Sequence, residues 1–171
     1  MPRGPLTALA TTALLAAALG GCAGDKSPQA PLCPRVGIIS GLEGFERQAP
    51  DGGGQLAYRA AMEHVEGGCG PESGDLVVQI SLDLIVEPGP AFAGGVTELP
   101  YFVAISAPDG TVIDRQDFVA RVSVPTRTRR GGVTDTFSQR FVGRAAGATQ
   151  YQVLFGFTLP EDEALRQHNA G

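Results

Sequence analysis

Few side chains of the 171-residue sequence have the types and spacing that catalysis requires. His64 is the only histidine before the last few residues, and a general base needs a nucleophile and an orienting acid within hydrogen-bond reach. No serine lies in the context of a nucleophile elbow, and the 18 acidic residues have no diagnostic spacing. We therefore expect His64 to lie on the surface of a strand, and we expect the chain not to be an enzyme.

The other residues that could bind a metal or a ligand are also sparse. Three cysteines and two scattered histidines do not form a zinc-ligand set, so no metal or cofactor is expected. Trp is absent and there are only three Tyr, which leaves little for a carbohydrate-stacking surface.

Arginines form the densest group of cations in a chain with 13 basic and 18 acidic residues. Arg121, Arg127, Arg129 and Arg130 could bind an acidic partner, or the phosphates of an anionic glycolipid, through paired guanidinium hydrogen bonds. The alternative is a solvated loop whose arginines keep one end of a sheet soluble. The net charge of −5 argues against a nucleic-acid partner, whose phosphates require clustered cations.

The N-terminus has the features of a targeting segment. Arg3 precedes an uncharged run over 6–18, which is shorter than the about 20 apolar residues that span a bilayer. The following Leu19-Gly20-Gly21-Cys22 resembles the lipobox of bacterial lipoproteins. That resemblance implies a signal peptide over 1–21, cleavage before Cys22, a diacylglyceryl group on its thiol and an acylated amine, for example with palmitate. The alternative is an ordinary secretory signal.

The resemblance also bears on location. Ala23 follows the cysteine, where retention in the inner membrane usually requires Asp in that family. This implies the periplasmic face of the outer membrane. Two or three acyl chains anchor a protein stably, and 22–32, with two prolines, is expected to be the lipidated cysteine and a flexible tether.

With Cys22 lipidated, Cys33 and Cys69 remain as a pair. Disulfides persist in the periplasm, so we expect a bridge between them. In the chain-entropy model a loop of this length stabilises the fold by roughly 4 kcal/mol. The alternative is two reduced thiols.

Apolar residues alternate with polar ones over most of 33–159, which is typical of strands with one buried face. The strongest run is Leu76 to Val86. Pro108-Asp109-Gly110 predicts a hairpin between 101–106 and 111–124, and the first half of the second strand is polar on both faces, so it should overhang the core or bulge. Further strands are expected at 35–40, 56–66, 133–141 and 151–157, with loops at 41–54, 87–100 and 125–132. Segment 56–66 also suits a helix, because Ala, Met, Glu and Arg favour one.

These elements predict a mainly β chain. With 24 Gly and 13 Pro, many turns should connect six or seven strands of an antiparallel sandwich over 33–159, followed by a short helix and tail over 160–171. The strand at 151–157 resembles the late strands of immunoglobulin-like and fibronectin-like domains. The whole chain resembles small, uncharacterised lipoproteins of Gram-negative bacteria, a group that implies no activity.

From these features we expect a non-catalytic binding or scaffolding module. A periplasmic carrier or chaperone with an apolar cleft between its sheets is the alternative, and a small envelope hydrolase is the third hypothesis.

Overall fold

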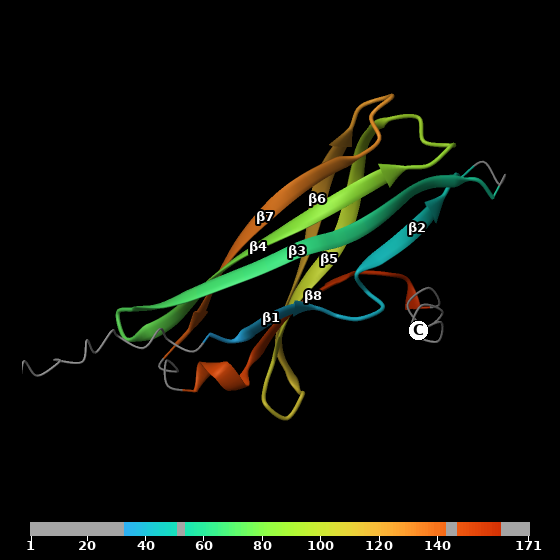
Figure 1. The fold of residues 1–171 in the computed structure, drawn as a ribbon. Coiled ribbons are helices and arrows are strands. Elements are labelled where there is room, and N and C mark those ends of the chain that lie inside the picture. Colours follow the sequence, from blue (N-terminus) through green and yellow to red (C-terminus); the bar gives the residue numbers. More distant parts are fainter. Residues whose placement is uncertain (1–32, 51–53, 143–146, 162–171) are drawn as a thin grey trace, which may run out of the picture.

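The computed structural model describes residues 33–50, 54–142 and 147–161, which form two four-stranded sheets packed face to face (Figure 1). The predicted mainly β sandwich is therefore confirmed. The predicted signal peptide, Cys22 and the tether lie outside the described residues, and so does most of the predicted helix and tail over 160–171.

Sheet A has the strand order β1-β8-β5-β6. Its strands are β1 (Arg35–Ile38), β8 (Gln152–Phe157), β5 (Gly95–Ser106) and β6 (Val112–Val124). β1 pairs with β8 in parallel, and the other pairs are antiparallel. Because β6 ends the order, one of its two edges has no strand partner in the described part of the chain.

Sheet B has the order β2-β3-β4-β7, with antiparallel pairs throughout. Its strands are β2 (Gly44–Gln48), β3 (Leu56–Glu72), β4 (Asp75–Pro88) and β7 (Gly131–Phe141). A short 3₁₀ turn, η1 (Ala148–Gln150), precedes β8. In an immunoglobulin domain the last two strands are neighbours in one sheet, whereas here β7 and β8 lie in opposite sheets.

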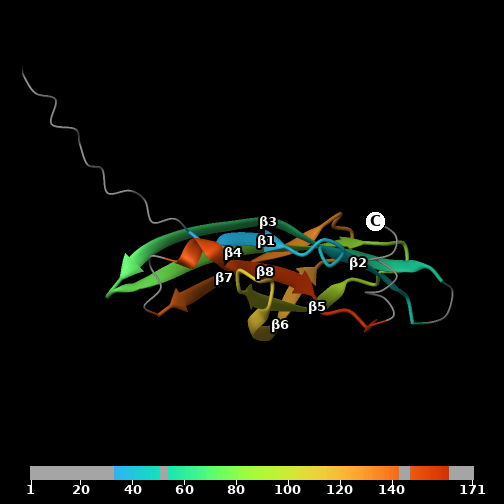
Figure 2. The same ribbon diagram turned by 90° about the horizontal axis from the view of Figure 1, so that it is seen from below.

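The core lies between the two layers, which Figure 2 shows nearly edge-on, with β3 on one side and β5 and β6 on the other. The alternation predicted for β4 is confirmed, since the six apolar side chains on its inner face are at most 3% exposed: Leu76, Val78, Ile80, Leu82, Leu84 and Val86. Sheet A supplies the facing layer, which includes Leu99, Tyr101, Val122, Val124, Phe155 and Phe157.

The predicted disulfide between Cys33 and Cys69 is present, with a Cα–Cα distance of 5.6 Å. It joins the residues just before β1, in sheet A, to β3, in sheet B. Beside it the two strands approach closely, because a Cβ added at Gly67 would lie 2.7 Å from Cγ2 of Val36. The bridge therefore fastens the short strand β1 across the layers.

Segment 56–66 is a strand, so the helical alternative is wrong. β3 continues to Glu72 and pairs with β2 on one side and β4 on the other. Its register with β4 shifts between Glu63 and Glu66, and His64 in this bulge has a φ of 45°. Pairing along both edges thus overrides the helix propensity of Ala, Met and Glu.

The loop predicted over 41–54 is wrong for Gly44–Gln48, which form β2. Only Phe45 of this strand is buried, and its ring packs against Phe157 with centroids 4.9 Å apart. A short edge strand that buries one side chain shows little alternation, and the sandwich consequently has eight strands instead of six or seven.

The loop predicted over 87–100 is also too long, because β5 begins at Gly95 and includes Pro100. The carbonyl oxygen of Pro100 accepts a hydrogen bond from the amide of Thr158, just beyond the end of β8. The proline nitrogen lies on that same side of the strand, where no ladder hydrogen bond is required of it.

The hairpin between β5 and β6 forms where Pro108-Asp109-Gly110 predicts it. Gly110 has a φ of 86°, and the amide of Ala107 donates to the carbonyl of Thr111 at 2.8 Å. The register shifts between Ile105 and Ser106, and β6 is exposed from Val112 to Asp117. The predicted bulge and overhang are therefore both confirmed.

Candidate interaction surface

His64 lies on the outer face of sheet B with 74% of its side chain exposed, as expected for a surface histidine. Two acids lie near it, because its Nδ1 is 3.9 Å from Oε2 of Glu63 and 3.8 Å from Oδ2 of Asp83. The hydroxyl of Thr134 donates to Asp83 at 2.5 Å, and a guanidinium nitrogen of Arg130 donates to Glu63.

This arrangement differs from a catalytic triad. A triad needs the hydroxyl to donate to the imidazole and a buried acid to orient the ring. Here the hydroxyl bonds to the acid directly, and His64 is open to solvent. The group has the geometry of a surface charge cluster.

The predicted arginine group is divided between the two faces of the sandwich. Arg121, on β6, forms an ion pair with Glu98 of β5 at 3.3 Å, whereas Arg130 pairs with Glu63 on β3. Glu98 and Glu63 each neutralise one arginine, and the two glutamates belong to different sheets. The four arginines therefore do not form one continuous patch.

Arg127 and Arg129 lie between these two, on the exposed turn that joins β6 to β7. Arg127 has a φ of 73°, and the turn is closed by Thr128, whose hydroxyl donates to the carbonyl of Pro125 at 2.7 Å. Among the described residues no ion pair is formed by Arg127 or Arg129. Of the predicted group, these two cations alone remain available to an anion.

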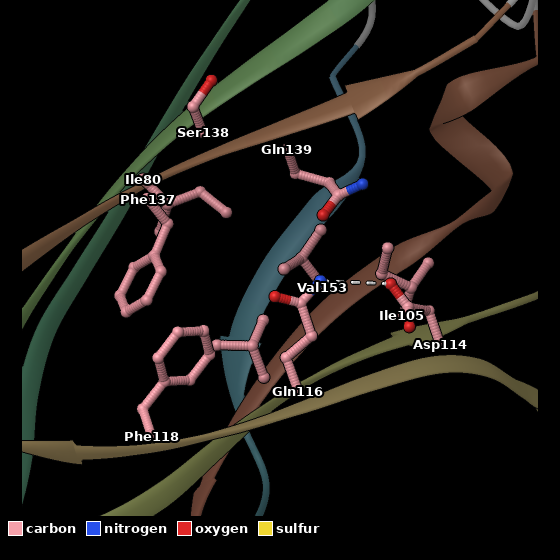
Figure 3. A pocket seen from close by; sticks show the side chains of 10 residues that line it. Ile80, Ile105, Asp114, Gln116, Phe118, Phe137, Ser138, Gln139 and Val153 are labelled. Carbon is pink, nitrogen blue, oxygen red and sulfur yellow. Dashed lines mark hydrogen bonds between the residues drawn. The ribbon is translucent and has the colours of Figure 1, made fainter.

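A crevice opens between β6 and β7, on the side of the sandwich where both sheets end (Figure 3). Its apolar part includes Phe118 and Phe137, whose ring centroids are 5.2 Å apart. Asp114 and Gln116 of β6 and Ser138 and Gln139 of β7 add polar side chains. The crevice measures about 80 Å³, well below the about 300–1,000 Å³ of typical small-molecule sites.

A partly buried hydrogen bond joins the two sheets on this side. The hydroxyl of Tyr101 on β5 donates to Oδ2 of Asp135 on β7 at 2.7 Å. Burial, and then the hydrogen bond to Asp135, raise the pKa of the Tyr101 phenol above its ordinary value of 10.0. The phenol therefore stays a neutral donor, and the bond fixes β7 against sheet A.

Exposed aliphatic side chains gather on β5 and β6. Five large hydrophobic residues are exposed in the described part of the chain, and four of them are Val96, Val112, Ile113 and Val119, each 52–60% exposed. We call these four residues the β5–β6 patch. They are spaced along the hairpin, with Val112 and Ile113 near its turn, Val119 in the middle of β6 and Val96 near the start of β5.

The outer face of sheet A is covered on one half only. Leu42, from the connection between β1 and β2, lies over β8, since a Cβ at Gly156 would be 3.1 Å from Cβ of Leu42 and 3.0 Å from Cζ of Phe102. The amide of Phe157 donates to the carbonyl of Leu42 at 2.9 Å. This cover does not reach β6, whose outward side chains remain exposed.

Two opposite charges lie in the middle of the uncovered half. The guanidinium carbon of Arg115 is 3.8 Å from the ring centroid of Phe102, and its Nη2 donates to Oδ1 of Asp117 at 2.9 Å. The hydrogen bond from Arg115 lowers the pKa of Asp117. An open depression of about 430 Å³ includes both residues and Val119.

The β5–β6 patch was not predicted from the sequence. Its signal is present in β6, where Val112-Ile113 and Phe118-Val119-Ala120 place apolar residues on both faces of the strand. A strand with only one buried face needs apolar residues on that face alone. The second set therefore predicts apolar side chains that the fold leaves exposed.

Within the described ranges there is no group of three His, Cys, Asp or Glu side chains that could hold a metal. The same part of the chain contains no helix long and apolar enough to cross a membrane. No protein-family model matches the chain, and no curated protein or solved structure resembles it significantly.

Proposed function

We propose that the protein is a lipoprotein of the outer membrane that faces the periplasm and binds an envelope protein without catalysis. The observation that carries the binding role is that four of the five exposed large hydrophobic side chains in the described residues lie on one hairpin, along the uncovered half of sheet A. Exposed apolar surface of this kind is typical of protein–protein contacts.

The location rests on the sequence around Cys22, which resembles a lipobox, and on Ala23 after it. The bridge between Cys33 and Cys69 supports an oxidising compartment, because disulfides persist in the periplasm. A lipid anchor keeps the domain close to one membrane, which suits a partner in the same envelope.

The crevice favours surface binding over the carrier alternative. A lipid or peptide carrier needs an enclosed cavity of several hundred Å³, whereas the crevice between β6 and β7 measures about 80 Å³. The larger depression beside Val119 is open and lies outside the sandwich. The contact surface is therefore the outer face of β5 and β6.

Crosslinking in intact cells tests this function. A photoreactive amino acid at Val119 should give specific adducts, whereas the same group at Thr136, which is exposed on the outer face of sheet B, should give few. Replacing Cys22 with Ser should move the protein from the membrane fraction to the soluble periplasm. Equal labelling at the two positions would refute the binding surface, and a membrane-bound Cys22→Ser variant would refute the anchor.

An anionic glycolipid is a second candidate partner, because Arg127 and Arg129 are exposed and carry no ion pair among the described residues. Replacing both with Glu should abolish sedimentation with vesicles that contain lipopolysaccharide. Arg121→Glu is the matched control, since that arginine is already paired with Glu98. Equal binding by both variants would exclude this candidate.

A further inference from the structure

Strand β6 presents an open edge that is long enough to pair with another strand. It has 13 residues and pairs with β5 on one side only. From Val112 to Asp117 all of its side chains are exposed. An edge of this kind offers a row of free amides and carbonyls to a further strand.

The sequence of β6 is complementary to itself about Gln116. Two copies of a strand that pair antiparallel about a two-fold axis place each residue opposite the one equally far on the other side of that axis. With the axis at Gln116, Arg115 faces Asp117 of the second copy and Ile113 faces Val119 of the second copy. Arg115, Asp117 and Val119 project from the outer face of sheet A, because alternate residues of a strand share a face. Ile113 is the extra residue of the bulge in β6, where this alternation is interrupted.

Neighbouring registers lose this match. If the axis is moved by one residue, either Arg115 faces Arg115 or Asp117 faces Asp117 of the second copy. A larger shift, to an axis at Phe118, brings Arg115 opposite Arg121. Like charges directly opposite each other destabilise a strand pair, so the sequence favours a single register.

The two central charges contact each other on the outer face of sheet A, and Arg115 leans towards β5 instead of the open edge of β6. Arg115 is stacked on Phe102 and donates to Asp117 in the same chain at 2.9 Å. A guanidinium has five N–H donors, so it can bind a second carboxylate without releasing the first. Pairing then gives a block of four charges, two on each strand, in which each Arg has one Asp beside it on its own strand and another across the axis.

On the inner face of β6 the paired side chains are less complementary, but their polar groups remain open to water. Gln116 faces Gln116 of the second copy, and two amides can donate to each other. Asp114 faces Phe118 of the second copy, at the rim of the crevice between β6 and β7, where its carboxylate keeps solvent. The outer face therefore determines the register.

We propose that the partner of the β5–β6 patch is a second copy of this chain, paired antiparallel through β6 with Gln116 on the two-fold axis. This inference rests on the proposed function and names its partner. Two sheets A then join into one eight-stranded sheet across the dimer.

Charge exchange between the two positions tests the pairing. In all proteins Cys22 is replaced with Ser, so that acyl chains do not hold the copies together, and mass is measured by light scattering after size exclusion. Arg115→Asp and Asp117→Arg each put like charges opposite each other twice, and each should weaken the dimer by roughly tenfold or more. The unaltered chain should be a dimer at the same concentration.

Mixing the two single variants gives the decisive control. In the mixed pair every Asp faces an Arg across the axis, while the contact between residues 115 and 117 within each chain stays broken. The mixture should therefore form a heterodimer although each variant alone is a monomer. A mixture that stays monomeric would overturn the proposed register.

A monomeric unaltered chain at about 100 µM would overturn the self-pairing itself. The proposed function is judged separately, by the adducts formed at Val119 in cells. Adducts with a different protein would preserve the binding surface and refute the second copy, and the lack of any adduct would refute both.

Discussion

Strands β4 and β6 are of similar length, 14 and 13 residues, and both carry several aliphatic side chains. β4 lies between β3 and β7, and its inner aliphatics are at most 3% exposed. β6 lies at an edge, and Val112, Ile113 and Val119 are more than half exposed. The aliphatic side chains of β4 therefore lie mostly in the core, whereas those of β6 are divided between the core and the solvent.

The difference shows that an aliphatic side chain in a strand has two uses. In β4 it is removed from water when the chain folds, and it stabilises the monomer. At Val112, Ile113 and Val119 of β6 it is left in water by folding, so that any gain comes only when a partner covers it. Mutations should separate the two uses, with large effects on folding in β4 and effects on association in β6.

The largest expected effect is in β4. Leu84→Ala should lower the free energy of unfolding by about 2–5 kcal/mol, because a fully buried side chain is replaced by a cavity. Ile113→Ala in β6 is the matched control and should change it by less than about 0.5 kcal/mol. Urea unfolding of the monomeric proteins measures both, and similar losses in the two variants would contradict the comparison.

An intermediate effect is expected where β5 meets β7. Tyr101→Phe leaves Asp135 without its donor and should cost about 1–2 kcal/mol at pH 7. Because burial raises the pKa of Tyr101, its phenol stays neutral in the folded protein while it ionises near 10.0 in the unfolded chain.

This contribution to stability is complete below pH 10.0 and decreases as the pH rises above that value. The unaltered protein should therefore lose more stability than the Phe variant between pH 9 and pH 11. Parallel losses in the two proteins would show that the tyrosine is not responsible.

The smallest effect on folding is expected at Val119. Val119→Thr keeps the shape and the strand propensity of the side chain, so the free energy of unfolding should stay within about 0.5 kcal/mol. The dimer should become about 2- to 30-fold weaker, because one exposed aliphatic side chain beside the axis becomes polar in each copy. Sedimentation equilibrium measures the association, and an unchanged dissociation constant would remove Val119 from the interface.

The parts of the fold that were predictable are those in which burial and periodicity coincide. β4 and the hairpin at Pro108-Asp109-Gly110 follow from alternation and turn chemistry, and the disulfide follows from the assignment of Cys22 to lipid. β2 was not predictable in the same way, because an edge strand that buries only Phe45 has no alternation to detect. Pro100 concealed the start of β5, since its position opposite the end of β8 is a tertiary property.

The candidate surface was less predictable than the fold. Arg121, Arg127, Arg129 and Arg130 are close in sequence, but Glu98 and Glu63 neutralise two of them from different sheets. Such partners are set by strand order, which periodicity does not reveal. The exposed residues of β6 were visible as apolar positions on both faces, yet only the packing of the two sheets shows which of those faces lacks a cover.

The most direct test of the role of β6 is amide hydrogen exchange measured at several protein concentrations on the Cys22→Ser protein. Amides of β4 should exchange slowly at every concentration, because they are paired within the monomer. Alternate amides over 112–119 should exchange fast in dilute solution and become protected as the concentration rises. If the exchange rates over 112–119 do not depend on protein concentration, β6 does not pair with a second copy.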